Sequence, residues 1–201
     1  ILRDITINKA SQTITFPDPA AQTYVPGGTF ALAATASSGL AVTYTSSTTG
    51  VCTVSGSTVT KVAAGTCTIN ANQAGNANYN AAAQVPKNIA IGKANQTITF
   101  PAQTVTSQPY TLNGTFSVAP LASASSGLAI TYGSSTTSIC TVSGATVTKV
   151  AAGTCTITAN QAGNTSYNAA TQQTQSVTIT STVPGAPTIG TGTAGDASAL
   201  I

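Results

Sequence analysis

The sequence contains very few residues that can ionise. Its 201 residues include no histidine and no glutamate, and charged residues make up 4% of the chain, where about a quarter is usual. Acid–base and nucleophilic catalysis need such groups close together. The three acids, Asp4, Asp18 and Asp196, form no carboxylate pair and no triad. We therefore expect no catalytic residues and no enzymatic activity.

Positive charge is equally sparse. The formal net charge is +3, and the basic residues stand alone along the chain: Arg3, Lys9, Lys61, Lys87, Lys93 and Lys149. Without a basic cluster there is no site for neutralising phosphates, so no nucleic-acid partner is expected. We interpret Lys61 and Lys149 as edge or solvent-facing charges that discourage association between sheets. No apolar run reaches the length of a membrane span, so no membrane contact is expected from this segment.

Metal ligands are also scarce. The loops at residues 72–80 and 160–168 carry asparagine where a calcium loop would carry carboxylates. The four cysteines are not arranged as paired CxxC motifs, and no histidine can join them. We predict neither a metal site nor a cofactor.

The sequence does contain a long internal repeat. The stretch INKASQTITFP, which begins at Ile7, returns as IGKANQTITFP at Ile91. SSGLAVTY at Ser37 returns as SSGLAITY at Ser125, and these two copies are four positions further apart than the first two. The difference predicts a four-residue insertion in one loop. Repetition at this period indicates tandem units, which we place at residues 8–92 and 93–180.

The flanking segments fit the same repeat. Residues 1–7, ILRDITI, precede the first unit as VPKNIAI at 85–91 precedes the second. They are predicted to be the last strand of an upstream copy or an N-terminal extension. Residues 181–201 contain proline and several glycines and are predicted to be a linker followed by the start of another domain.

Within each unit, apolar residues alternate with threonine and serine at the two-residue period of β-strands. Ile14 and Phe16 share one face, as do Cys67, Ile69 and Ala71. Turn residues separate about seven such strands per unit. The fold class predicted from this pattern is all-β, with two antiparallel sheets packed face to face in each unit.

The cysteines belong to the repeat. VCTVSGSTVTKVAAGTC, which contains Cys52 and Cys67, returns with Cys140 and Cys155, and the spacing is the same in both pairs. The alternation points all four sulfurs into the core. One pair per unit indicates a structural disulfide formed in an oxidising compartment, which would contribute about 3 kcal/mol. If the strands follow the usual order of a sandwich, the bond joins the fourth and sixth strands across the two sheets. Two buried free thiols, or a chemically active pair, are the alternatives.

These motifs together resemble the bacterial immunoglobulin-like repeats found in tandem in very large secreted and cell-surface proteins. The resemblance rests on KASQTITF, ASSGLAVTY, the cysteine-bracketed segment and NQAGNANYNAA, and covers most of residues 8–180. It implies two tandem immunoglobulin-like β-sandwiches in an extracellular or cell-surface protein of the adhesin-stalk type. The VPGAPTIG stretch within residues 181–201 resembles the first strand of a fibronectin type III domain.

Three functions are considered. The first is a structural spacer, whose partners are neighbouring repeats and whose surface ligand is bound by other domains. The second is a self-assembling extracellular filament or sheath subunit, in which terminal strands add to identical subunits. The third is a carbohydrate-binding or ice-binding module that uses a threonine ladder. The ladder residues are Thr66, Thr68, Thr154 and Thr156. We expect the rings of Tyr79 and Tyr167 to fold back over the end of each core.

Overall fold

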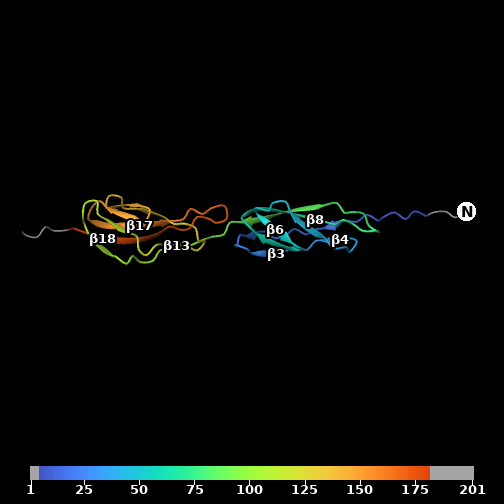
Figure 1. The fold of residues 1–201 in the computed structure, drawn as a ribbon, viewed down its shortest axis with the longest axis horizontal. Helices are drawn as coiled ribbons and strands as arrows, with labels where there is room; N and C mark the ends of the chain where they lie inside the picture. Colours follow the sequence, from blue (N-terminus) through green and yellow to red (C-terminus); the bar gives the residue numbers. More distant parts are fainter. Residues whose placement is uncertain (1–4, 182–201) are drawn as a thin grey trace, which may run out of the picture.

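The computed structural model describes residues 5–181. Every regular element in this range is a β-strand. Two units follow each other along the long axis of the molecule, with the N-terminal unit nearer the end marked N (Figure 1). The predicted fibronectin-like start lies outside the described residues from position 182 onward. Residues 5–7 form no strand here, and Ile5 and Ile7 are 85% and 91% exposed.

Each unit contains nine strands, two more than the pattern of alternation predicts. The strands of the first unit are β1 (Ile14–Thr15), β2 (Gln22–Thr23), β3 (Thr29–Ala31), β4 (Thr35–Ala36), β5 (Thr43–Ser46), β6 (Cys52–Ser55), β7 (Thr58–Lys61), β8 (Gly65–Asn72) and β9 (Val85–Gly92). The strands of the second unit are β10 (Ile98–Thr99), β11 (Ser107–Pro109), β12 (Thr115–Ser117), β13 (Ser123–Ala124), β14 (Thr131–Ser134), β15 (Cys140–Ser143), β16 (Thr146–Lys149), β17 (Gly153–Asn160) and β18 (Gln173–Thr180). The additional strands, β2 and β4 with their copies, have two or three residues, too few for a periodic pattern to be visible.

The two units have the same topology. In the first, a four-stranded sheet has the order β2-β9-β8-β5, a three-stranded sheet the order β3-β7-β6, and β1 pairs with β4. The second repeats this with β11-β18-β17-β14, β12-β16-β15 and β10-β13. All pairs are antiparallel except β2 with β9 and β11 with β18, which are parallel. The predicted fold class, two tandem immunoglobulin-like β-sandwiches, is confirmed.

Each unit has its own hydrophobic core. The alternation along β8 buries Cys67, Ile69 and Ala71 completely, and Val59 of β7 meets them from the other sheet. The second unit repeats this core around Ile157 of β17. Since each core is made from one unit's own strands, each unit buries its apolar side chains without its neighbour.

The predicted four-residue insertion is in fact two separate insertions. Phe16 and its copy Phe100 keep the shorter spacing of the first repeated motif. The equivalent edge residues Gln22 and Gln108 are already two positions further apart. The full difference is already present at Ala34 and its copy Ala122, whose N–H groups donate to the hydroxyls of Tyr44 and Tyr132. The second unit therefore gains two residues before β11 and two more between β12 and β13.

Candidate functional site: the disulfides and the repeat junction

Both cysteine pairs are disulfide-bonded in the structure. Cys52 of β6 is bonded to Cys67 of β8, and Cys140 of β15 to Cys155 of β17. Their Cα atoms are 5.6 Å and 5.5 Å apart, and all four residues are fully buried. Since β6 and β8 belong to different sheets, each bond ties the two layers of its sandwich together.

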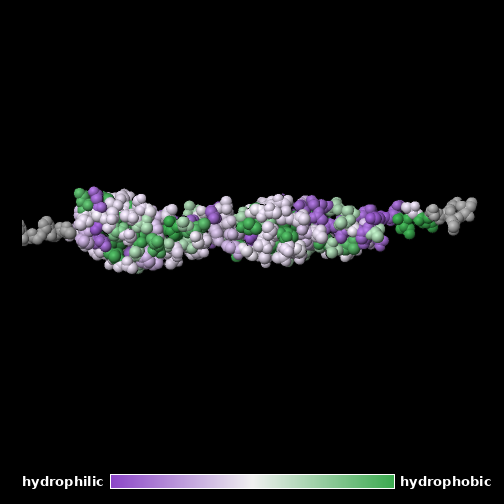
Figure 2. All heavy atoms as spheres, viewed as in Figure 1, coloured by the Kyte–Doolittle hydropathy of each residue, from purple (hydrophilic) through white to green (hydrophobic). Residues whose placement is uncertain are grey.

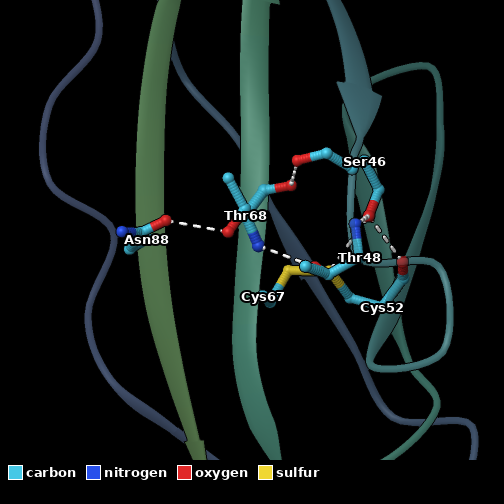
Figure 3. The surroundings of a disulfide bond; sticks show 7 residues. Ser46, Thr48, Cys52, Cys67, Thr68 and Asn88 are labelled. Atoms are coloured by element: carbon cyan, nitrogen blue, oxygen red, sulfur yellow. Dashed lines mark hydrogen bonds between the residues drawn. A yellow bond between two sulfur atoms is a disulfide. The ribbon is translucent and has the colours of Figure 1, made fainter.

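Hydroxyl groups surround the first disulfide (Figure 3). The Ser46 hydroxyl donates to the carbonyl oxygen of Cys52 at 2.8 Å, and its oxygen lies 3.4 Å from the Cys52 sulfur. The Thr48 hydroxyl oxygen lies 3.7 Å from the same sulfur and accepts from the backbone N–H of Thr68 at 2.8 Å. Redox-active cysteines are accessible to solvent, whereas Cys52 and Cys67 are fully buried. The arrangement therefore favours a structural bond.

The second disulfide has the same surroundings. The hydroxyl oxygens of Ser134 and Thr136 lie 3.3 Å and 3.8 Å from the Cys140 sulfur, and Thr136 accepts from the N–H of Thr156 at 2.9 Å. These four hydroxyl residues were not predicted from the sequence. The signal was present, because SSTT begins at Ser46 and again at Ser134.

A buried lysine makes a second tie between the sheets. The interpretation of Lys61 and Lys149 as solvent-facing is wrong, because they are only 8% and 4% exposed. Alternation along β7 places Lys61 on the inward face with Val59, and its ammonium donates to the Thr23 carbonyl of β2 at 3.0 Å. The strand ends at Lys61, and the next residue, Val62, is 45% exposed.

Lys149 is held in the same way. Its ammonium donates to the carbonyl of Pro109 in β11 at 2.8 Å. Glycine gives both lysine stems room to pass. A Cβ on Gly28 would lie 2.8 Å from Cε of Lys61, and one on Gly114 would lie 3.1 Å from Cε of Lys149. The charge is therefore used inside the sandwich to join its sheets.

A buried glutamine fastens the start of each unit to its last long loop. Gln12 donates to the Asn80 carbonyl at 2.6 Å and to the side chain of Gln73 at 3.2 Å, and accepts from the Ser38 hydroxyl. Gln96 makes the same contacts in the second unit, with Asn168, Gln161 and Ser126. The repeated motifs KASQTITF and NQAGN thus meet each other in space and have a structural role.

The asparagine loops are also stabilised from within. The side-chain oxygen of Asn76 accepts from the backbone N–H groups of Asn78 and Tyr79 at 2.8 Å and 2.9 Å. Asn164 does the same in the second unit. Among the described residues, no three His, Cys, Asp or Glu side chains come together as a metal site.

Very little chain separates the two units. The Gly92 carbonyl, at the end of β9, accepts from the N–H of Tyr24 in the first unit at 2.8 Å. The N–H of Ala94 donates to the Ser166 carbonyl in the second unit at 2.9 Å. Lys93 alone lies between these two anchored residues, so few backbone dihedral angles separate the units.

Two side-chain contacts bridge the units directly. The rings of Tyr24 and Tyr167 meet edge to face, with centroids 5.6 Å apart and planes at 85°. The Ser166 hydroxyl accepts from the N–H of Ala64 at 3.3 Å, and Ser166 is only 7% exposed. The prediction that Tyr167 folds over its own core missed this role, because a repeat pattern shows equivalent positions and not which unit a ring faces.

The second unit differs from the first where its two insertions meet. Gln103 in one insertion is buried, accepts from the N–H of Ala119 at 2.8 Å and donates to the Pro120 carbonyl at 3.3 Å in the other. Beside them lies an open hollow of about 450 Å³, lined by Leu121, Ile130, Thr131, Tyr132, Gly144 and Ala145. This lining offers shape and apolar surface but no carboxylate, amine or imidazole for acid–base chemistry.

The exterior is weakly polar. Most atoms in Figure 2 have pale colours, as expected from a surface of threonine, serine and alanine with little charge. In the threonine ladder, the Thr68 hydroxyl already donates to Asn88 at 2.8 Å. The described residues contain one ion pair, between Lys87 and Asp18. No helix within residues 5–181 is long and apolar enough to cross a bilayer.

No protein-family model matches the sequence, and no curated protein sequence matches it either. Among solved structures, Drosophila N-cadherin EC1-3 shares 13% identity over 87% of this chain and 69% of its own, with a TM-score of 0.33. Domains 1–6 of the surface-layer protein SbsC share 18% over 86% and 28%, with a TM-score of 0.30. A C-terminal intimin fragment, solved with the intimin-binding domain of its translocated receptor, shares 19% over 69% and 51%, with a TM-score of 0.29. The fold class is therefore defined by the chain's own strands. They form tandem immunoglobulin-like sandwiches, each with one disulfide between its two sheets.

Proposed function

We propose that this chain is a non-enzymatic structural spacer, a stalk segment of a bacterial cell-surface or secreted protein of the adhesin type. The observation that carries the proposal is the junction, where Lys93 alone separates residues hydrogen-bonded to different sandwiches. A spacer must keep its ends apart, and a junction with one unanchored residue does this better than a flexible linker.

The junction contacts are weak individually but sufficient for a covalently linked pair. An edge-to-face tyrosine pair contributes about 1 kcal/mol, and a hydroxyl hydrogen bond contributes less than about 1 kcal/mol when it is as long as 3.3 Å. Together they favour the aligned arrangement by about tenfold. The same contacts would bind separate molecules very poorly, so the alignment depends on the short connection.

The disulfides support a location outside the cytoplasm. Two fully buried disulfides suit a protein that folds and stays in an oxidising environment. A module of this kind gains mechanical persistence because each bond links two sheets. The partners we assign to it are neighbouring repeats, with any surface ligand bound elsewhere in the parent protein.

Small-angle X-ray scattering of the oxidised chain tests the proposal. The expected result is the scattering of one elongated particle whose maximum dimension equals two sandwiches placed end to end and does not change with concentration. A matched variant, Tyr167→Ala, should broaden the distance distribution while each unit stays folded. A compact particle, or a wild-type distribution as broad as that of the variant, would contradict the spacer role.

A second function, the filament subunit, is favoured by one observation. Ile5 and Ile7 are exposed on a segment that forms no strand in the described chain, and such a segment can add to the sheet of another molecule. Negative-stain microscopy of the purified chain separates the two functions. Single rods support the spacer. Ordered fibres that form from the original chain but not from an Ile5→Asp/Ile7→Asp variant support the filament.

A further inference from the structure

The exposed isoleucines match buried ones in the repeat. When INKASQTITFP is aligned with IGKANQTITFP, Ile5 and Ile7 are equivalent to Ile89 and Ile91. These two residues are 1% and 3% exposed and belong to β9, a central strand of the four-stranded sheet. Residues two apart on a strand share a face, so the spacing suits entry into a core. In Figure 2 hydrophobic atoms stand out on the thin extension beside the grey N-terminal residues.

The segment of residues 5–9 joins the first unit in the same way as the end of β9 joins the second unit. Ala10 forms an isolated parallel bridge with Tyr79, and Ala94 forms the same bridge with Tyr167. The hydrogen bonds are nearly equal in length, since Ala10 N–H donates to the Asn78 carbonyl at 2.8 Å and Ala94 N–H to the Ser166 carbonyl at 2.9 Å. Residues 5–9 therefore approach the first unit along a route equivalent to that of the inter-unit connection.

The end of the first unit is built like the face that holds the junction. Tyr79 takes the position of Tyr167 and is half-buried, and Asn78 takes the position of Ser166. An asparagine side-chain oxygen accepts hydrogen bonds as a serine hydroxyl does. Both groups that reach across the junction thus have counterparts at this end.

We infer that Ile5, Ile7, Asn78 and Tyr79 form one half of a second junction, whose partner is another sandwich of this fold in the same polypeptide. That repeat takes the segment that contains Ile5 and Ile7 into its core, between its equivalents of β2 and β8. Its equivalent of Tyr24 packs against Tyr79. The inference rests on the proposed spacer function and adds the residues and partner through which the array continues.

A covalently linked partner fits this surface better than a separate molecule. The strand equivalent to β9 lies inside a four-stranded sheet, paired on both sides, so the partner is incomplete until the strand is inserted. The remaining contacts are a single ring pair and a single hydrogen bond, which are too few to hold a separate molecule. A repeat that leads directly into residues 1–7 supplies the strand at high effective concentration.

An extended chain tests the inference. Residues 8–84 of the sequence, which hold every strand of the first unit except β9, are placed directly before residue 1 of the full chain. The added copy then has residues 1–7 as its only source of a last strand. We expect it to fold, to add a third cooperative unit in calorimetry, and to slow amide exchange in the peptide of residues 1–8 by about a hundredfold or more.

Matched variants separate the outcomes. Ile5→Asp/Ile7→Asp should unfold the added copy in the extended chain, yet leave the original chain unchanged. If the peptide of residues 1–8 exchanges equally fast in both chains, or the Asp variant keeps the added copy folded, the inference fails. Fibres of the original chain that require Ile5 and Ile7 would also overturn it, since the strand would then enter a separate molecule. The rod shape of the original chain is measured without the added copy, so the spacer function is judged independently.

Discussion

Removing one disulfide should weaken one unit and leave the other intact. The change is Cys52→Ala with Cys67→Ala, which keeps Cys140 and Cys155 as an internal control. The bond closes a sequence separation of 15, and its loss restores chain entropy to the unfolded state worth about 3 kcal/mol. A small domain is stable by about 5 to 15 kcal/mol, so the altered unit should remain folded in water.

The effect should be large in denaturant. With a urea slope of about 1 kcal/mol per molar for a unit of this size, a loss of about 3 kcal/mol lowers the midpoint by about 3 M. Pulsed hydrogen exchange with mass spectrometry at increasing urea reads each unit from its own peptides. The junction contributes only about 1 to 2 kcal/mol, so the second unit should keep its midpoint within about 1 to 2 M.

Two results would refute this reasoning. A midpoint shift below about 0.5 M in the first unit would mean that the disulfide adds little to the sheet packing around it. An equal shift in both units would mean that they unfold as one body. The reciprocal variant, Cys140→Ala with Cys155→Ala, should reverse the pattern and checks that neither result is peculiar to one unit.

Three further predictions follow from buried contacts. Gly75→Ala should destabilise its unit by about 1 to 3 kcal/mol more than Gly39→Ala. Both glycines have a similar positive φ, but only at Gly75 would a Cβ collide with the Tyr79 carbonyl. Equal losses of unfolding free energy in urea denaturation would disprove the collision. Gln12→Leu should cost about 1 to 3 kcal/mol by leaving the Asn80 carbonyl and the Ser38 hydroxyl without their partner, whereas Gln84→Leu at the surface should cost under about 0.5 kcal/mol; similar melting of the two variants would contradict this. In amine acetylation followed by mass spectrometry, Lys61 and Lys149 should react much more slowly than Lys9 and Lys93, because the amines of Lys61 and Lys149 are buried and hydrogen-bonded. Equal rates at all four lysines would show that Lys61 and Lys149 are exposed to solvent.

Much of the fold could be predicted because its signal is local. The two-residue alternation in β8, where Cys67, Ile69 and Ala71 share a face, is repeated in β17 and requires a buried sheet in each unit. The cysteines lie within such alternations, so their inward direction follows from the strands. Because the two units repeat the same pattern, each prediction made for the first unit also holds for the second.

The predictions failed where the determining contact is distant in sequence. Val59 and Lys61 alternate inward together, but only the position of the Thr23 carbonyl shows that a charge can be satisfied there. The parallel strand β2 has two residues and is specified by the edge of β9 rather than by its own sequence. Tyr167 contacts the other unit, which no periodicity within its own unit encodes.

The proposed spacer requires that the junction hold the two sandwiches in one orientation. Residual dipolar couplings of backbone amides, measured in a weakly aligning medium, test it most directly. Couplings from residues 8–92 and 93–180 are expected to fit a single alignment tensor of one magnitude, and Tyr167→Ala is expected to lower the magnitude for one unit. Two tensors of clearly different magnitude in the unmodified protein would show that the units move independently and that the junction does not orient them.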